Sequence, residues 1–369
     1  MRLLPPICYY SNQLVLLFLT FIVLKANCQT NELLNHFQEN SIELENLDNP
    51  IDFNLDIEEI KNTLFFAQGE VHGIATYERI KLELLKYLYL HAGVRVYVVE
   101  LGSSHAFLFN QFLQTGSQDL ISGFNESETQ FWIDLKNFND RNIEKIEVVG
   151  IDFERTSAIR KAFDILLSTD VPEVIIGNID ALKRAFKRNL AIKTRSVLFE
   201  KTQELVKDNE SIYREYFGDK YHIFHSIIFN DVPTKGTTKR DKYMLDRFIT
   251  YHSKHPGSKY FGVFGISHAN RNLNTLVGML VKSQALPFEN RVTVFSPQYM
   301  NCQTEYGNKT LTVDNYGLLT QEKVKNRTDI INDLENDLIL IDLEGLEGKY
   351  KKINLASDYL IVVKNQRKN

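Results

Sequence analysis

An apolar run, a turn and an amphipathic segment follow one another early in the chain. Residues 63–73 begin with apolar positions and end in a turn that carries two glycines, an acid and an imidazole. Beyond the turn, apolar residues recur at the spacing of one helical face, at Tyr77, Ile80, Leu84 and Leu88. The other faces are expected to carry the charged residues Glu78, Lys81 and Lys86. The pattern predicts a strand, a tight turn and a helix.

Further short apolar runs predict the remaining strands of a sheet. They cover residues 94–99, 148–151, 260–264, 292–295, 338–341 and 359–363. Helical patterns lie between several of them, including residues 106–113 and 158–167. Strands that alternate with helices form βαβ units. The predicted fold class is therefore α/β, with a mostly parallel central sheet flanked by helices.

A helical insertion interrupts this alternation. Residues 178–221 are charged, contain no proline and show no strand pattern. We expect one long helix or a helical hairpin over the carboxyl edge of the sheet, within an insertion at residues 178–230. It can act as a lid or as a solvated structural element. Residues 29–369 are predicted as one domain, with a polar lead-in that has a short helical pattern at residues 42–47.

The N-terminus has the features of a secretory signal peptide. Arg2 precedes an apolar run at residues 14–24, which Lys25 ends. This run is too short to cross a hydrocarbon core of about 30 Å, which takes about 20 helical residues. It fits a signal peptide at residues 1–28 with a cleavage site after Cys28, and a signal anchor is the alternative. We expect export to the periplasm or the extracellular space, with no membrane span after cleavage.

Composition narrows the possible partners. The formal net charge is -4 and no long basic run is present, which argues against a nucleic-acid partner. Removal of the signal peptide leaves Cys302 alone, so no internal disulfide is expected. No glycine-rich phosphate loop is present, and we expect no cofactor. The expected partner is a small-molecule substrate, bound by a monomer or small homo-oligomer.

Charged side chains follow several of the predicted strands. Glu70 and His72 come after the first strand and Glu100 after the second. Asp152 and His268 follow two later strands. The carboxyl ends of parallel strands meet at one edge of a sheet, so we expect these side chains to share a site there. The alternative is that they are only the polar residues with which any strand must end.

These residue types suit the activation of water. An imidazole can take a proton from water near neutral pH, and a neighbouring carboxylate fixes its tautomer. Arg240, which opens a later helix, can hold a carboxylate or a developing oxyanion. His105 is a further candidate for the lining of the cleft. Trp132 either caps the pocket or packs in the core.

The order of these motifs resembles the erythromycin esterase family. The matching segments are Gly-Glu-Val-His-Gly at residues 69–73, Val99-Glu100, Arg240-Asp241 with Met244, and Phe-Gly-Ile-Ser-His at residues 264–268. The segments at residues 110–116 and 150–152 are similar to the family as well. The resemblance runs from about residue 63 to residue 295.

The resemblance implies an α/β hydrolase-like enzyme outside the Ser-His-Asp class. In the family a histidine is the proposed general base for attack of water on a lactone. Carried over by motif, His72 is the expected base, with Glu70 and Glu100 as its acidic partners. With the strand-end pattern, the expected substrate-binding residues are Arg240, His268, Asp152 and His105.

The chain departs from the esterases at two motifs. One residue separates Glu70 from His72, where the esterases have Glu-x-x-His. Gly265 stands where the first of two later histidines is usual. The shorter spacing is similar to that of haem- and iron-binding lipoproteins in the same wider clan.

Three functions therefore stay open at the level of sequence. The first is a metal-independent hydrolase of an ester or lactone with His72 as base. The second is a metallohydrolase in which the same histidines and carboxylates bind a divalent cation and lower the pKa of its water. The third is an exported binding protein that holds haem or a metal complex without turnover.

Overall fold

The computed structural model describes most of the chain after residue 31. The described residues are 32–44, 51–154, 158–167, 170–188, 190–230, 237–288, 291–306 and 309–366. The signal peptide predicted at residues 1–28 lies outside them. Within the described ranges, no helix is long and apolar enough to cross a bilayer.

A mixed sheet forms the centre of the molecule, in the order β1-β10-β11-β6-β2-β5-β3-β4, with β9 added on β6. Neighbours from β11 to β4 are parallel, whereas the β1–β10, β10–β11 and β6–β9 pairs are antiparallel. The mostly parallel α/β fold expected from the sequence is confirmed. The strands are β1 (Ser41–Glu43), β2 (Phe65–Glu70), β3 (Val96–Val99), β4 (Glu147–Gly150), β5 (Tyr260–Gly265), β6 (Val292–Met300), β9 (Tyr316–Gly317), β10 (Leu338–Asp342) and β11 (Tyr359–Lys364).

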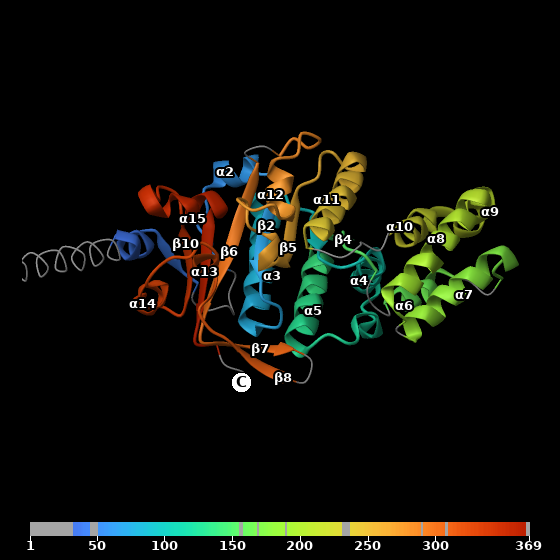
Figure 1. The fold of residues 1–369 in the computed structure, drawn as a ribbon, viewed down its shortest axis with the longest axis horizontal. Helices are drawn as coiled ribbons and strands as arrows, with labels where there is room; N and C mark the ends of the chain where they lie inside the picture. Colours follow the sequence, from blue (N-terminus) through green and yellow to red (C-terminus); the bar gives the residue numbers. More distant parts are fainter. Residues whose placement is uncertain are drawn as a thin grey trace, which may run out of the picture.

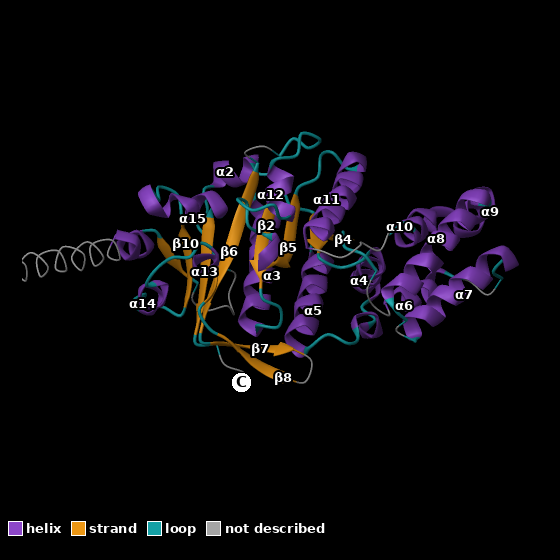
Figure 2. Ribbon diagram, in the orientation of Figure 1, coloured by secondary structure: helices purple, strands orange, loops and turns teal. Residues whose placement is uncertain are grey.

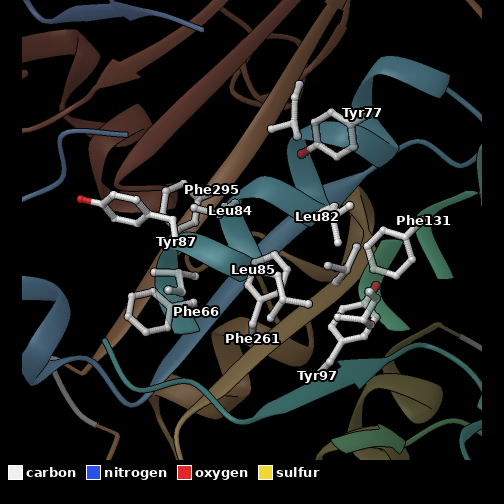
Figure 3. Packing of buried hydrophobic residues seen from close by; sticks show 14 of the residues in the cluster. Phe66, Tyr77, Leu82, Leu84, Leu85, Tyr87, Tyr97, Phe131, Phe261 and Phe295 are labelled. Atoms are coloured by element: carbon white, nitrogen blue, oxygen red, sulfur yellow. The ribbon is translucent and has the colours of Figure 1, made fainter. Parts of the chain in front are cut away.

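Helices cover both faces of this sheet (Figure 2). One face carries α3 (Ala75–His91), α4 (Ser103–Thr115) and α5 (Glu126–Arg141), and the other carries α11 (Thr237–Lys254) and α12 (Leu276–Val281). Leu85 of α3 packs in one cluster with Phe66 and Phe261 of the sheet (Figure 3). Side chains alternate along a strand, so Phe65 faces the opposite side and meets Phe248 of α11.

The insertion has its own apolar core beyond the β4 end of the sheet (Figure 1). It consists of α6 (Ala158–Leu166), α7 (Glu173–Lys187), α8 (Ile192–Asp208), α9 (Glu210–Phe217) and α10 (Tyr221–Ile228). The expectation of one long helix or a hairpin is wrong. The chain turns between α7 and α8, at Asn209, and at Gly218, whose positive φ of 50° ends α9. The short helices pack on one another and on α4.

The lead-in also differs from its prediction. Residues 32–39 are helical, and β1 follows where part of a helical pattern was expected at residues 42–47. β1 pairs with β10, so the edge of the sheet supplies backbone partners that a local pattern does not reveal. The other elements are α2 (Ile57–Asn62), β7 (Cys302–Tyr306), β8 (Lys309–Val313), α13 (Leu318–Gln321), α14 (Arg327–Asn332), α15 (Lys351–Ala356) and 3-10 helices at Gln118–Ile121, Gly218–Lys220, Ile266–His268 and Gly348–Tyr350.

Candidate active site

The turn between β2 and α3 presents an acid and an imidazole side by side. Glu70 is the last residue of β2 and is buried, whereas the His72 side chain is 61% exposed. Gly73 follows with a φ of 82°, a conformation that favours glycine and lets the chain reverse into α3. Thr304 of β7 donates a hydrogen bond to the His72 carbonyl. The turn is thus held by β7, which pairs with β8 in an antiparallel hairpin, as well as by the sheet.

Glu70 and His72 form a carboxylate–imidazole pair. His72 Nδ1 lies 2.7 Å from Glu70 Oε1. This hydrogen bond and the charge of Glu70 raise the pKa of His72 to about 9. Burial opposes the charge on Glu70, but Lys81 and the hydrogen bond with His72 outweigh it and lower the pKa of Glu70 to about 2. At neutral pH the pair is a carboxylate and an imidazolium, and Nε2 is the ring nitrogen left for water or a ligand.

Lys81 of α3 lies buried against the same carboxylate. Its Nζ is 3.5 Å from Glu70 Oε2 and 2.6 Å from Glu78 Oε2. Burial favours a neutral amine, yet the charges of Glu70 and Glu78 raise the pKa of Lys81 well above its ordinary value. The sequence pattern placed Glu78 and Lys81 on faces of the helix other than its apolar one, and the structure shows that both are nevertheless buried. Each is buried because the other neutralises it.

Arg240, in the first turn of α11, joins two of the predicted acids. Its Nη2 donates to Glu100 and, at 2.7 Å, to Asp152 Oδ2, while Nε donates to Asp152 Oδ1 at 3.2 Å. Asp152 is completely buried. Burial works against a charge on Glu100, but Arg240, His268 and the Gly265 N–H lower its pKa. The guanidinium therefore positions the carboxylates that end β3 and β4.

A second carboxylate–imidazole pair lies next to this network. His268 Nδ1 contacts Asp241, and its Nε2 lies 3.2 Å from Arg240 Nη1. Both contacts are satisfied when Nδ1–H donates to Asp241 and Nε2 accepts from Arg240. The N–H of Gly265, which replaces the expected extra histidine, donates to Glu100 Oε2 at 2.7 Å.

The parallel strands explain why these groups converge. At the carboxyl ends of β2 to β5, Glu70 contacts His72, and Arg240 contacts Glu100, Asp152 and His268. The two groups meet at one pocket, which Glu70, His72 and Glu100 line. Gly150 allows the end of β4 to approach the β3–α4 turn, because a Cβ there would lie 2.4 Å from the Gly102 carbonyl oxygen. The predicted common edge is therefore observed as an arrangement. The catalytic and binding roles of its residues stay predictions.

An apolar pocket opens beside this edge. It has a volume of about 390 Å³, and its lining includes Glu70, His72, Glu100 and Trp132. The predicted site residue His105 is not among the described lining residues, and its ring lies 6.1 Å from that of Phe109. A larger groove of about 780 Å³ lies around the far end of α3. We place the site at the smaller pocket because its lining carries the paired imidazole and acids.

The carboxylates of the site that could bind a metal ion are already paired with cationic side chains of the protein. Glu70 contacts His72 and Lys81, and Glu100 contacts Arg240. Across the described part of the chain, no group of three or more histidine, cysteine, aspartate or glutamate side chains is arranged to hold a metal ion. His72 Nε2 is the one nitrogen of its ring that a metal or a haem iron could use without breaking the pair with Glu70.

Three participants were missed at the level of sequence. For Lys81 and Glu78 the sequence does contain a signal. Lys81 lies four residues after Tyr77 and therefore in the apolar stripe of the helix. Charges in such a stripe are rare unless they are paired. Asp241 was noted only as a neighbour of Arg240. Its contact with His268 spans 27 residues, and no local pattern reports it.

Known proteins share this fold. No protein-family model and no curated protein matches the sequence. Solved structures that match include a succinoglycan biosynthesis protein (TM-score 0.66, 16% identity) and a Bacillus cereus protein (TM-score 0.63, 15% identity), each over 91% of this chain and 97% of the other. A mutant of the erythromycin esterase EreC in its open conformation matches with a TM-score of 0.59 and 13% identity, over 88% of this chain and 97% of its own. The chain therefore has the α/β fold of these proteins, and the resemblance found in its motifs extends to the fold.

Proposed function

We propose that this protein is an exported hydrolase in which water attacks an ester or lactone bond, with His72 as general base. The observation that supports it most is the 2.7 Å contact between Glu70 and the exposed imidazole of His72, at the rim of an apolar pocket. A buried acid that orients an accessible imidazole is the arrangement that general-base catalysis needs. The export predicted from residues 1–28 is part of the proposal.

The proposed step uses the free-base form of His72. Nε2 takes a proton from water while the water oxygen bonds to the carbonyl carbon of the substrate. The C–O bond to the leaving group then breaks, and the leaving oxygen receives the proton. Glu70 holds Nδ1–H and stabilises the imidazolium. Arg240, His268 and Asp152 keep their proposed roles in binding the substrate, through the network that holds Glu100. His105 does not line this pocket, so the proposed step does not use it.

The metal-dependent alternative has less support, because its possible metal ligands already have partners in the protein. Glu70 and Glu100 would have to exchange Lys81 and Arg240 for the metal. Each exchange would leave a partly or wholly buried cation with one of its two carboxylate partners removed, which is unfavourable. The second alternative, binding of haem or a metal complex without turnover, is served by the same Nε2. Absorbance of the protein after incubation with haem, beside the esterase assay, separates it from a hydrolase.

Replacement of His72 by asparagine is expected to lower kcat at least about 100-fold, because the general base is lost. Asparagine retains a side-chain donor that can reach Glu70, so the fold is expected to stay intact. The measurement is hydrolysis of a panel of esters and lactones, with circular dichroism as a check on folding. His91→Asn, at the exposed end of α3, is the matched control and is expected to keep full activity. Retained hydrolysis in His72→Asn would rule out the proposed base.

The pH profile offers a second test, through Glu70. The raised pKa of His72 means that its free base forms as pH rises through about 9, so kcat/KM is expected to rise over that range. In Glu70→Gln the pKa of His72 is expected to fall toward its ordinary value of about 6.5, which moves the rising limb to lower pH by about 2 units. Identical profiles for wild type and variant would show that the pair does not control the base.

A further inference from the structure

Five of the fourteen residues that line the pocket beside Glu70 and His72 are aromatic. Trp132 and Phe109 stack with ring centroids 3.8 Å apart and an interplanar angle of 18°. Tyr97 and Phe131, which lie close together in Figure 3, have centroids 5.6 Å apart. These rings come from β3, α4 and α5 and enclose about 390 Å³, a volume within the usual range for a small-molecule site. The pocket can therefore take an apolar body of that size.

The charged groups around these rings are mostly acids. In the described part of the chain, the carboxylates in the pocket or in direct contact with its charged network are Glu70, Glu78, Glu100, Glu128 and Asp152. The cations in the same network are Lys81, Arg240 and His72. Acids thus outnumber cations. A ligand with a negative charge would be repelled, whereas one with a positive charge would be attracted.

Glu128 is the acid best placed to meet a charged ligand. It lies in the first turn of α5 and is half-buried in the pocket wall. One of its oxygens accepts a hydrogen bond from the backbone N–H of Asn125 at 3.1 Å. It has no ion pair among the described residues. Its charge is consequently available to a ligand in the pocket.

The pocket already holds one ammonium group against an aromatic face. Lys81 Nζ lies 4.7 Å from the centroid of the Phe131 ring. Aromatic faces attract cations because of their quadrupole, and the effect grows when the cation is desolvated. We propose that the pocket binds an organic cation, an amine on an apolar body, through its aromatic walls and Glu128. Binding of the amine needs no turnover and does not depend on the proposed function. That the amine belongs to a substrate is a further step, and this step alone rests on the proposed function.

Trp132 makes this binding measurable. It is the single tryptophan of the chain and lines the pocket, so its fluorescence reports on occupancy. The probes are 2-phenylethylamine, the neutral 2-phenylethanol and the anionic 3-phenylpropanoate, titrated into the whole protein at neutral pH. The amine is expected to bind at least about fivefold more tightly than the alcohol, and the carboxylate more weakly than both. Added salt is expected to weaken the amine alone.

Two variants on one helix turn complete the test. Glu128→Gln removes the charge and keeps the capping box of α5, and it is expected to weaken the amine about threefold to tenfold while the alcohol is unaffected. Glu126→Gln, an exposed acid in the same turn and outside the lining, is expected to bind like wild type. Equal affinity for amine and alcohol, no binding of any probe, or equal effects of the two variants would overturn the proposal. Amine binding by a protein that hydrolyses no member of the ester and lactone panel would overturn the proposed hydrolase alone.

Discussion

Arg240→Met is expected to lower the free energy of unfolding by about 3–5 kcal/mol, the usual effect of removing one partner from a buried ion network. The guanidinium is the link between Glu100 and the completely buried Asp152, and it donates to His268 as well. Without it two carboxylates stay close together, and like charges in a buried site destabilise it strongly. A loss of this size is a large part of the about 5–15 kcal/mol that stabilises a typical domain. The measurement is the midpoint of urea unfolding, followed by circular dichroism.

Two further variants show whether the geometry of Arg240 or only its charge matters. Arg240→Lys keeps the charge but loses the fork of donors, so it is expected to fall between wild type and Arg240→Met. Lys242→Met, two residues further along α11, removes an exposed pair with Asp246 and is expected to change stability by less than about 1 kcal/mol. If Arg240→Met lowered the free energy of unfolding no more than Lys242→Met does, the ion network of Arg240 would not contribute measurably to stability.

The strands and their common edge could be predicted because their causes are local. A strand buried on both faces is a short, mostly apolar run, and charged residues are expected only beyond it, at its carboxyl end. This is why Glu70, Glu100, Asp152 and His268 could be placed together before the strand order was known. The order itself, with β5 between β2 and β3, does not follow from the runs. The antiparallel direction of β10 and the pairing of β1 with it are equally non-local.

The interior of the site was harder to predict, because buried charges are set by partners that are distant in sequence. Arg240 contacts Glu100 across 140 positions and Asp152 across 88. Helical spacing does place Lys81 on an apolar stripe. Its burial as a charged group is explained only when the end of β2 is placed beside it, because Glu70 supplies one of its counter-charges. The prediction of one long helix or a helical hairpin for the insertion failed for a related reason. Its helices bury their apolar faces on each other and on α4, and a charged pattern without proline does not show where they break.

Lys81→Met is expected to lower the free energy of unfolding by about 3–5 kcal/mol, a loss similar to that of Arg240→Met. The Lys81 ammonium is buried between Glu78 and Glu70, at 2.6 and 3.5 Å from their oxygens. Its removal leaves Glu78 buried without a counter-charge and leaves Glu70 with His72 alone. Burial already raises the pKa of Glu78, and loss of Lys81 raises it further. Urea unfolding of the single variant at neutral pH measures the effect.

A double variant separates charge from packing at Lys81. If the loss in Lys81→Met comes from an unpaired carboxylate, Lys81→Met with Glu78→Leu is expected to recover most of it, because an apolar pair of similar volume suits a buried site. If Lys81 stabilises the protein only through the packing of its methylene chain, methionine can replace that packing, and the free energy of unfolding of the single variant is nearly unchanged. Glu83→Gln, whose partner Lys86 lies closer to solvent on the same helix, is the control and is expected to change stability by less than about 1 kcal/mol. A double variant as unstable as the single one would mean that Glu70, and not Glu78, is the acid that depends on Lys81.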